Sequence, residues 1–353
     1  IPDSVTELGS NVFRDCESLE TLIIGNGVTS LEAYLFYNCT NLKNVVIGDG
    51  VSSIKASLFS GYSNLEYVTL GKNVSIIGER AFEDCIALKD IIIPEGVKSI
   101  GERAFANCSS LVSITIPATV KSIGKYAFAN CTNLKSIYAS SLEDWLEIER
   151  EGFVDEVSTT YTSFGLLTNG TDLYFDGEIV KNIIVPDSVT SIDYARFEGC
   201  TSLESVVIGN NVTEIDRYAF NNCNNLKNVV ISNNVKEIKE YSFANCDNLE
   251  SITIFADECS FDYYCGLNYN HTIYAFKGST AEKFADKIGA EFIDIETVHS
   301  HEYKIVETVK PTCSESGKTT KRCICGKENV TETAKLPHTE VKLAAKASAC
   351  TKT

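Results

Sequence analysis

The residues best suited to chemistry in this chain are fourteen cysteines and four histidines. Thiols and imidazoles can form disulfides, bind metal ions, or act together as nucleophile and base. The histidines are His271, His299, His301 and His338, so none lies in the long N-terminal part that holds most of the cysteines. A catalytic pair of nucleophile and histidine is therefore excluded there. The sequence also lacks the GxGxxG and GxxxxGK patterns that cradle phosphates, and we expect no enzyme activity.

The strongest candidate for a metal site lies near the C-terminal end of the sequence. Two histidines and two cysteines recur there at a spacing of 37 residues, which indicates a short module that is present one and a half times. Three thiolates and one imidazole are a common tetrahedral ligand set for zinc. A disulfide from Cys313 to Cys323 or Cys325, or plain reduced thiols, are the alternatives, because an exported protein meets oxidising conditions. The candidate zinc ligands are Cys313, Cys323 and Cys325, with His301 or His338 as the fourth.

Most of the other cysteines lie on one grid with a spacing of 23 residues, and Tyr62 fills a vacant position of it. A phenylalanine stands three residues before each grid position, and a leucine stands three residues after it. Three linked columns with one period indicate a solenoid of leucine-rich repeat type. The grid cysteines are Cys16, Cys39, Cys85, Cys108, Cys131, Cys200, Cys223 and Cys246.

One repeat, VKSIGERAFANCSSLVSITIP at residues 97–117, predicts how each turn folds. Leu111, Ile114 and Ile116 lead into a short strand whose alternate residues point outward. The segment before it carries an outer turn or short helix that presents Phe105 inward. One repeat cannot bury its own apolar face, so we expect repeats to stack about 4.8 Å apart around a common core.

We interpret the grid cysteines as reduced side chains that pack in this core. Free cysteine is among the most buried residue types and behaves as a small apolar residue. Disulfides or metal binding along the grid are the alternatives.

Residues 137–183 interrupt the grid between two blocks of repeats. SSLEDWLEIER predicts a short amphipathic helix around Trp145, which we expect to anchor the insert to the core; a ligand platform is the alternative. Part of the insert fits a degenerate repeat, with Tyr174 at the phenylalanine position and Val180 at the leucine position. The same stretch, LYFDGEIV at residues 173–180, fits a hairpin that turns at Asp-Gly equally well.

The predicted fold is a solenoid of leucine-rich repeats, each a 23-residue unit of β-strand plus short helix or turn. We expect a curved right-handed array with an inserted island, a C-terminal α/β cap and a small β-rich tail module. Residues 271–295 fit the cap as strand, helix and strand, with Ser279 as the helix N-cap. The predicted domains are residues 1–136 (first repeat block), 137–183 (island with one degenerate repeat), 184–255 (second block), 256–295 (cap) and 296–353 (tail module).

Charge and hydropathy limit the classes of partner. A net charge of −17 repels phosphate backbones, so we expect no nucleic-acid partner. No run approaches the roughly 18 apolar residues of a membrane span, so we expect no span in this fragment. The chain begins inside a repeat, at Ile1-Pro2, and we expect any signal peptide to lie upstream.

The outward side of the strands is the candidate binding surface. Two columns of short polar and β-branched side chains run along it, with almost no charge in an otherwise acidic protein. β-propensity alone would select such residues. The functional interpretation is a flat, low-charge interaction face of the kind that solenoids use. The candidate ligand-binding residues are Asn44, Tyr67, Asp90, Ser113, Tyr138 and Asn228.

The repeat IGxxAFxxCxxLxxIxIP resembles the BspA-like class of leucine-rich repeat surface proteins over residues 1–255. The island and the GSTAEKFA segment of the cap also resemble segments of that family, in the same order. The resemblance implies export to the surface of a bacterium or an anaerobic protist, and adhesive or protein-binding roles. The tail, HEYKIVETVKPTCSESGKTTKRCICG, is similar to short tandem modules in surface proteins of Gram-positive anaerobes.

We therefore expect an extracellular binding or adhesion protein, either attached to the cell surface or secreted, with no catalytic function. Its expected partner is a protein or glycan ligand, such as a host matrix protein or another cell. The alternative is a carbohydrate-binding or substrate-capturing accessory region of a larger secreted enzyme. Clustered aromatic residues on the strand face would favour the alternative, and Tyr67 and Tyr138 are the two that the sequence places there.

Overall fold

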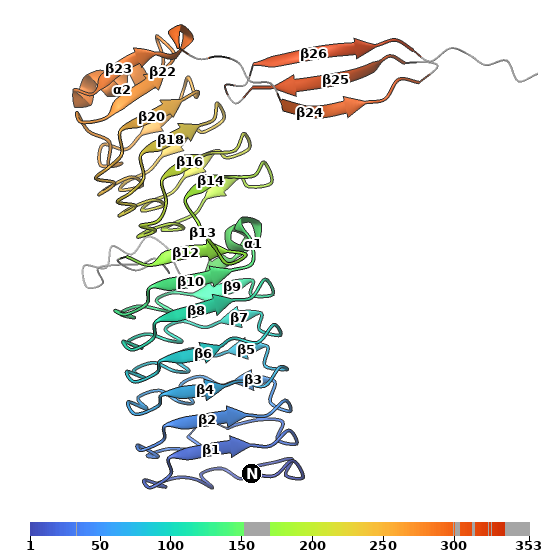
Figure 1. The fold of residues 1–353 in the computed structure, drawn as a ribbon, viewed down its shortest axis with the longest axis vertical. Coiled ribbons are helices and arrows are strands. Elements are labelled where there is room, and N and C mark those ends of the chain that lie inside the picture. The colour runs from blue at the N-terminus through green and yellow to red at the C-terminus, as the bar shows by residue number, and fades with distance from the viewer. Residues whose placement is uncertain are drawn as a thin grey trace, which may run out of the picture. The chain divides into compact units, whose positions relative to one another are not determined.

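The chain forms two compact units, an array unit, Ile1–Val298, and a tail unit, His299–Thr353. The array unit is a stack of short-stranded turns, so the predicted solenoid is confirmed (Figure 1). The computed structural model describes residues 1–32, 34–151, 170–298, 300, 304–312, 315–323, 325 and 327–335.

One side of the turns consists of parallel strands in which buried Val, Ile and Leu alternate with outward residues. Thr21 pairs with Asn44 and Asn44 with Tyr67, so neighbouring strands are one repeat apart. We call the outward surface of these strands the strand face. Its three sheets are β1 (Thr21–Ile24), β2 (Asn44–Ile47), β4 (Tyr67–Thr69) and β6 (Asp90–Ile92); β8 (Ser113–Ile116), β10 (Ser136–Ala139), β12 (Asp172–Phe175) and β13 (Glu178–Ile179); and β14 (Asn182–Ile184), β16 (Ser205–Val207), β18 (Asn228–Ile231), β20 (Ser251–Ile254), β22 (Thr272–Ala275) and β23 (Glu291–Asp294).

A second side of the turns carries shorter parallel strands, here called the rear strands. They follow the same repeat, as Ile54 pairs with Ile77 and Ile77 with Ile100. They form two sheets, β3 (Ser53–Ile54), β5 (Ile76–Ile77), β7 (Ser99–Ile100), β9 (Ser122–Gly124) and β11 (Glu149–Glu151), then β15 (Ser191–Ile192), β17 (Glu214–Ile215), β19 (Glu237–Ile238) and β21 (Ser260–Phe261).

The third side consists of outer turns, which confirms the turn rather than the short helix in the repeats. Consecutive outer turns are joined by backbone hydrogen bonds, such as Phe82 N–H to the Ala104 carbonyl at 2.7 Å. Each outer turn contains left-handed residues, for example Arg103 at φ 53° and Asn107 at φ 62°. Asparagine tolerates this conformation well, which explains its recurrence beside the grid cysteine.

The core between the three sides consists of aligned columns. Ring centroids of Phe82, Phe105 and Phe128 follow one another at 5.3 Å, close to the spacing of paired strands. The described grid cysteines are thiols, and all except Cys16 are buried, which confirms the reduced, packed column. The Cys108 thiol donates to the Phe82 carbonyl at 3.2 Å, so each turn is tied to its predecessor.

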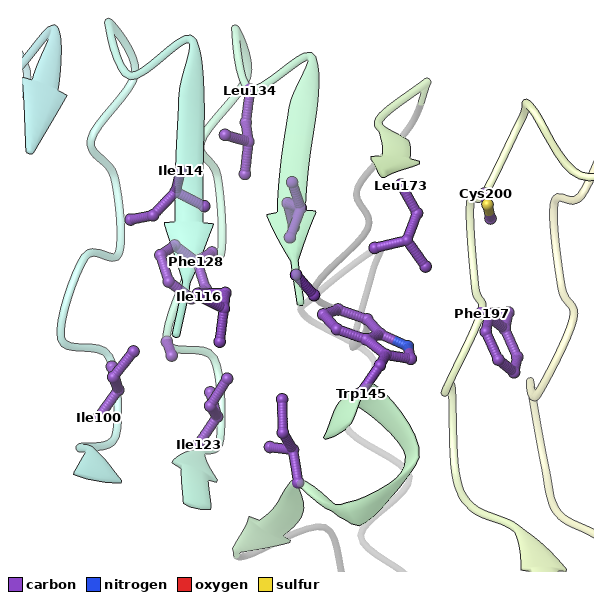
Figure 2. Close-up of a cluster of buried hydrophobic side chains, with 14 of the residues drawn as sticks. Ile100, Ile114, Ile116, Ile123, Phe128, Leu134, Trp145, Leu173, Phe197 and Cys200 are labelled. Atoms are coloured by element: carbon purple, nitrogen blue, oxygen red, sulfur yellow. The ribbon is translucent and has the colours of Figure 1, made fainter. Parts of the chain in front are cut away.

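At the island, a tryptophan occupies the place of the missing phenylalanine. Helix α1 (Leu142–Glu147) begins after Ser141, whose hydroxyl accepts the N–H of Asp144 at 3.1 Å. Trp145 is 0% exposed. Figure 2 shows its indole between Phe128 and Phe197, which belong to the first and second blocks. The predicted anchoring role of Trp145 is confirmed, because its side chain is buried in the core.

Both series of sheets end at the island and start again after it. The last strands before the break are β13 and β11, and the next sheets begin at β14 and β15. Thr171 and Cys200 form an isolated bridge across this region. Arg196, 1% exposed, donates to two carbonyls at the end of α1 at 2.8 and 2.9 Å and pairs with Asp193 at 2.6 Å. A buried arginine therefore ties the second block to the island.

The hairpin within residues 173–180 is confirmed, but the placement of Tyr174 at the phenylalanine position is wrong. Strands β12 and β13 pair antiparallel around Asp176 and Gly177, at φ 49° and 80°, values that glycine readily adopts. Strand β12 also pairs in parallel with β10, which sets Tyr174 opposite Tyr138. Tyr174 therefore lies in an outward column of the strand face. Residues 140–171 separate β10 from β12 along the chain, so the 23-residue period could not locate that column.

The cap closes the array as predicted, with α2 (Thr280–Ile288) between β22 and β23. The Ser279 hydroxyl accepts the N–H of Glu282 at 3.3 Å, which confirms it as the N-cap. A short 3-10 helix, Ile295–Thr297, follows β23. Strand β21 still pairs with β19, so the rear strands extend beyond residue 255, where the second block was expected to end.

The tail unit contains a three-stranded antiparallel sheet of β24 (Lys304–Val309), β25 (Gly317–Arg322) and β26 (Glu328–Thr333). This agrees with the small β-rich module expected there. Within the part of the chain that the structure describes, no helix has the length and apolar character needed to cross a membrane.

Candidate functional site

Two outward columns make up the strand face, because every second residue of each strand points away from the core. Within each sheet, the β-pairing fixes which residues of neighbouring strands stand opposite one another. The first column contains Thr21, Asn44, Tyr67, Asp90, Ser113, Ser136, Asp172, Asn182, Ser205, Asn228 and Ser251, and the second contains Ile23, Val46, Thr69, Ile92, Thr115, Tyr138, Tyr174, Ile184, Val207, Val230 and Thr253.

The structure brings some of the predicted ligand-binding residues together and separates others. Asn44, Tyr67 and Asp90 stand opposite one another on β2, β4 and β6. Ser113 and Tyr138 lie on the adjacent strands β8 and β10 of the next sheet, but in different columns.

The sixth predicted residue, Asn228, lies on β18 in the second block, between Ser205 and Ser251. It belongs to a different sheet from the other five. The predicted residues therefore form one row of three, one neighbouring pair and one separate position.

Exposed apolar side chains lie within and beside this row of Asn44, Tyr67 and Asp90. Val46 is 37% exposed, Tyr67 49% and Ile92 70%, although each lies on a regular strand. Adjacent exposed apolar residues, bordered by polar ones, are typical of interaction sites. The sheet fixes the backbone below them, so this patch is flat and rigid.

A column of charged residues borders the strand face, one residue before each of the strands β1, β2, β4 and β6, and the sequence analysis missed it. Lys43 pairs with Glu20 at 3.1 Å, and Lys89 pairs with Glu66 at 2.5 Å. The Lys89 ammonium also lies 5.5 Å from the centroid of the Tyr67 ring. The hydrogen bond to Glu66 raises the pKa of Lys89. The alternation of Glu and Lys from turn to turn was the sequence signal that could have revealed this column. Because the opposite charges balance, the border of the strand face is nearly neutral.

The grid thiols are placed for packing rather than for nucleophilic chemistry. Burial raises the pKa of Cys85 and of Cys131 to about 12. Their sulfur atoms donate to the carbonyls of Phe59 and Phe105 at 3.1 and 3.2 Å. Reaction requires the thiolate, which is scarce at neutral pH when the pKa is this high.

A family comparison decides which class of solenoid this is. The family model described as BspA type Leucine rich repeat region, with six copies, matches residues 1–111, 53–164 and 170–283. The chain belongs to the BspA-type leucine-rich repeat family. No curated protein matches the sequence.

Several solved structures are similar to this BspA-type chain. A leucine-rich cell surface protein from Faecalibacterium prausnitzii A2-165 is 26% identical, with 83% of this chain and 77% of that one covered and a TM-score of 0.46. A leucine-rich repeat protein from Bacteroides ovatus is 20% identical, with coverages of 82% and 88% and a TM-score of 0.40. The pneumococcal vaccine antigen PcpA is 17% identical, with coverages of 78% and 89% and a TM-score of 0.38.

Within the BspA-type array, sequence reasoning missed the strand-face residues of β12 and β14, among them Asp172 and Tyr174. The Tyr174 ring stacks on Tyr138, with centroids 4.7 Å apart and planes 30° from parallel. The sequence contained a signal for this placement: Asp-Leu-Tyr-Phe of β12 and Ser-Ile-Tyr-Ala of β10 have the same order of outward and buried side chains. The strand face therefore carries an aromatic pair beside the island.

The predicted zinc ligands lie in the tail unit, outside the BspA-type repeats. Cys323 and Cys325 follow β25 and are buried, at 1% and 6% exposure. His301, Cys313 and His338 lie outside the described residues. Among the residues that are described, no group of three or more His, Cys, Asp or Glu side chains is placed to hold a metal ion. The zinc site and its disulfide alternative stay predictions.

Proposed function

We propose that this chain is a cell-surface or secreted protein that binds a protein or glycan ligand through its strand face and catalyses no reaction. Membership of the BspA-type leucine-rich repeat family supports a binding role and an extracellular location. The partner class that we propose is a host matrix protein or a neighbouring cell.

The observation that carries the proposal is the row of Asn44, Tyr67 and Asp90 with its exposed apolar neighbours Val46 and Ile92. Side chains on three hydrogen-bonded strands have little backbone freedom to lose when a partner covers them. The adjacent lysines are already paired with glutamates, so few unpaired charges require desolvation. A rigid, weakly charged patch of this kind suits a macromolecular partner.

The experiment that tests the proposal combines Asn44→Lys, Tyr67→Ala and Asp90→Lys. These side chains lie at the surface, so we expect a change in melting temperature of only a few degrees. Binding to a panel of immobilised extracellular-matrix proteins, measured by surface plasmon resonance, should fall strongly. A control change directly before rear strand β7, Lys98→Ala, should leave binding unchanged.

The result that would contradict the strand-face assignment is equally specific. If the triple variant binds normally while Glu143→Lys with Glu147→Lys abolishes binding, the site lies on the island surface. Turnover of a peptide, ester or glycoside substrate by the purified chain would contradict the non-catalytic assignment.

A second candidate function is a carbohydrate-binding or substrate-capturing accessory region of a larger secreted enzyme. The stacked pair of Tyr138 and Tyr174 favours it, because aromatic side chains offer apolar area together with a hydroxyl group. Retention on an insoluble polysaccharide that is lost in Tyr138→Ala, with no binding to matrix proteins, would select this function.

For the tail unit we propose that its cysteines cross-link the three-stranded sheet, either by binding zinc or by forming a disulfide. A sheet of three strands with few apolar residues needs such a staple to fold, and burial of Cys323 and Cys325 side by side supports one. Elemental analysis of protein expressed with zinc, and never exposed to chelator, should find about one zinc per chain if metal is the staple. Absence of zinc with two titratable thiols fewer than the fourteen cysteines would reject zinc and establish the disulfide.

A further inference from the structure

Between two regular outer turns of the first block, the joining backbone hydrogen bonds are all missing. From the turn at residues 57–61 to the turn at residues 103–107, alternate N–H groups donate to the next turn, as Phe59 does to the Ala81 carbonyl at 2.9 Å. The equivalent bonds would run from residues 34–38 to residues 56–60. In the described part of the chain, none of them is formed. These two outer turns are therefore separated.

Tyr62, the tyrosine on the cysteine grid, explains the separation. Its hydroxyl donates to the Phe36 carbonyl, the role that the Cys85 thiol has toward the Phe59 carbonyl one turn later. The Tyr62 ring also contacts the edge of Phe59, with centroids 5.8 Å apart. A phenol group is much larger than a thiol group, so the equivalent hydrogen bond from Tyr62 holds the two turns further apart.

The separation creates a cavity of about 380 Å³ between the two outer turns. Its volume lies within the range of small-ligand sites. The described residues that line it include none that is charged, although the protein has a net charge of −17. The polar and aromatic groups at its walls are those of Tyr34, Tyr37, Asn38, Thr40, Ser57 and Ser60.

Tyr34 and Tyr37 form an aromatic corner of the cavity. They are 69% and 51% exposed, and their rings meet at 68° with centroids 6.3 Å apart. Tyr218 and Tyr241, in the second block, are instead stacked at 18° and cover each other's faces. Arg14 lies 5.1 Å from the Tyr37 centroid, over one face of that ring. The corner therefore leaves ring faces that a flat apolar surface can contact.

The separated turns also leave backbone groups for a ligand. The N–H groups of Phe36 and Asn38, and the carbonyls of Leu58 and Ser60, have no hydrogen-bond partner among the described residues. Together with the neighbouring hydroxyls they supply both donors and acceptors without charge. A neutral, hydroxyl-rich ligand with an apolar face matches this set, and a charged ligand does not.

We propose that this cavity binds the end of a neutral glycan, with a sugar ring against the tyrosine corner and its hydroxyls on the polar walls. The site lies on the outer turns and is independent of the strand face. Failure of one proposal therefore leaves the other intact.

The test begins with an array of cello-, xylo-, manno- and galacto-oligosaccharides, with sulfated and sialylated glycans as charged comparators. A bound oligosaccharide is then titrated calorimetrically into the whole chain and its variants. Tyr37→Ala should weaken binding about tenfold. Tyr62→Cys restores the grid cysteine, should bring the turns together, and should abolish binding without loss of thermal stability. Tyr241→Ala, on an outer turn of the second block, should bind normally.

Three results would overturn the proposal. The first is that the chain binds none of the neutral glycans, and the second is that it binds only the charged ones. The third is that Tyr37→Ala and Tyr62→Cys both bind a neutral glycan as tightly as the unaltered chain.

Discussion

The regular turns of the array and the turn at the island each bury an aromatic side chain in the core but are held together differently. Between regular turns of the first block, the rear strands pair without a break from β3 to β9, the strand-face ladder is interrupted between β6 and β8, and nearly every turn adds one phenylalanine and one cysteine to the core. At the island both series of sheets stop. There, Trp145 fills the core (Figure 2) and Arg196 donates to the carbonyls at the end of α1.

The difference shows where an array of repeats is robust and where it is vulnerable. In a solenoid, the free energy of unfolding is close to a sum of contributions from the repeats and from the interfaces between them. Where hydrogen-bonded strands continue from turn to turn, the neighbouring turns therefore compensate for one weak contact. The island interface depends on a few side chains instead. It also continues the strand face through β12, which joins the first block to the aromatic pair.

Alkaline pH should produce the largest effect, because it acts on all regular turns at once. Burial raises the pKa of Cys85, Cys131 and Cys246 to about 12 from an ordinary value of 9.0. Between these values the unfolded chain loses thiol protons that the folded chain keeps, so stability falls as pH rises from 9 toward 12. Each thiol contributes about 1.4 kcal/mol per pH unit, and these three together about 4.

Urea unfolding at a series of pH values between 8 and 10.5 measures this slope. The double variant Cys85→Ala, Cys131→Ala should have a shallower slope than the unaltered chain. An equal slope in both proteins would show that these thiols ionise freely in the folded state and are not buried in the core.

A charge in the cysteine column of a regular turn should have the next largest effect. Cys108 is 0% exposed, so Cys108→Asp buries a carboxylate and should cost about 4–7 kcal/mol, the equivalent of a pKa shift of 3–5 units. Cys108→Ala removes little volume and should cost about 1–2 kcal/mol. Equilibrium unfolding in urea gives both values. Rapid native-state labelling of Cys39, Cys108 and Cys223 by a thiol reagent would contradict the stacked core.

Removal of an aromatic ring distinguishes the island from the regular turns. Trp145→Ala and Phe105→Ala should each cost about 3–5 kcal/mol. The rear strands β5, β7 and β9 and the hydrogen bonds between outer turns run unbroken past Phe105, so Phe105→Ala should preserve a single unfolding transition. Trp145→Ala, in contrast, should let the two blocks unfold separately. Hydrogen exchange during urea unfolding, followed in each block, measures this. Coincident exchange of both blocks in Trp145→Ala would show that the island is not the weak interface.

The sequence predicted what is periodic and failed where periodicity ends. The strands, the phenylalanine and cysteine columns, the N-cap Ser279 and the buried Trp145 all follow from a fixed spacing or a local pattern. Tyr174 was placed wrongly because its column continues across an insert of different length. The contact of Arg196 with α1 joins residues 48 and 51 positions apart, and no local pattern indicates it.

The candidate binding residues show the same limit. Their outward direction follows from alternation along a strand, and the pairing of Asn44, Tyr67 and Asp90 follows from the period. The separation of Asn228 into another sheet and the aromatic pair at the island depend on where the sheets break. The cavity at Tyr62 depends on a single departure from the grid, whose consequence is visible only in the hydrogen bonds of the outer turns.

The central claim, that the strand face is the binding surface, is tested most directly by blocking it. Thr115→Cys places a reactive thiol on the strand face, and Lys98→Cys places one at an exposed position directly before rear strand β7, while the buried grid thiols react slowly. Each variant is coupled to a bulky maleimide–polyethylene glycol, and attachment to immobilised matrix proteins is measured before and after coupling. We predict that coupling at residue 115 abolishes attachment and that coupling at residue 98 leaves it intact. Attachment that survives coupling at residue 115 but is lost on coupling at residue 98 would contradict the claim.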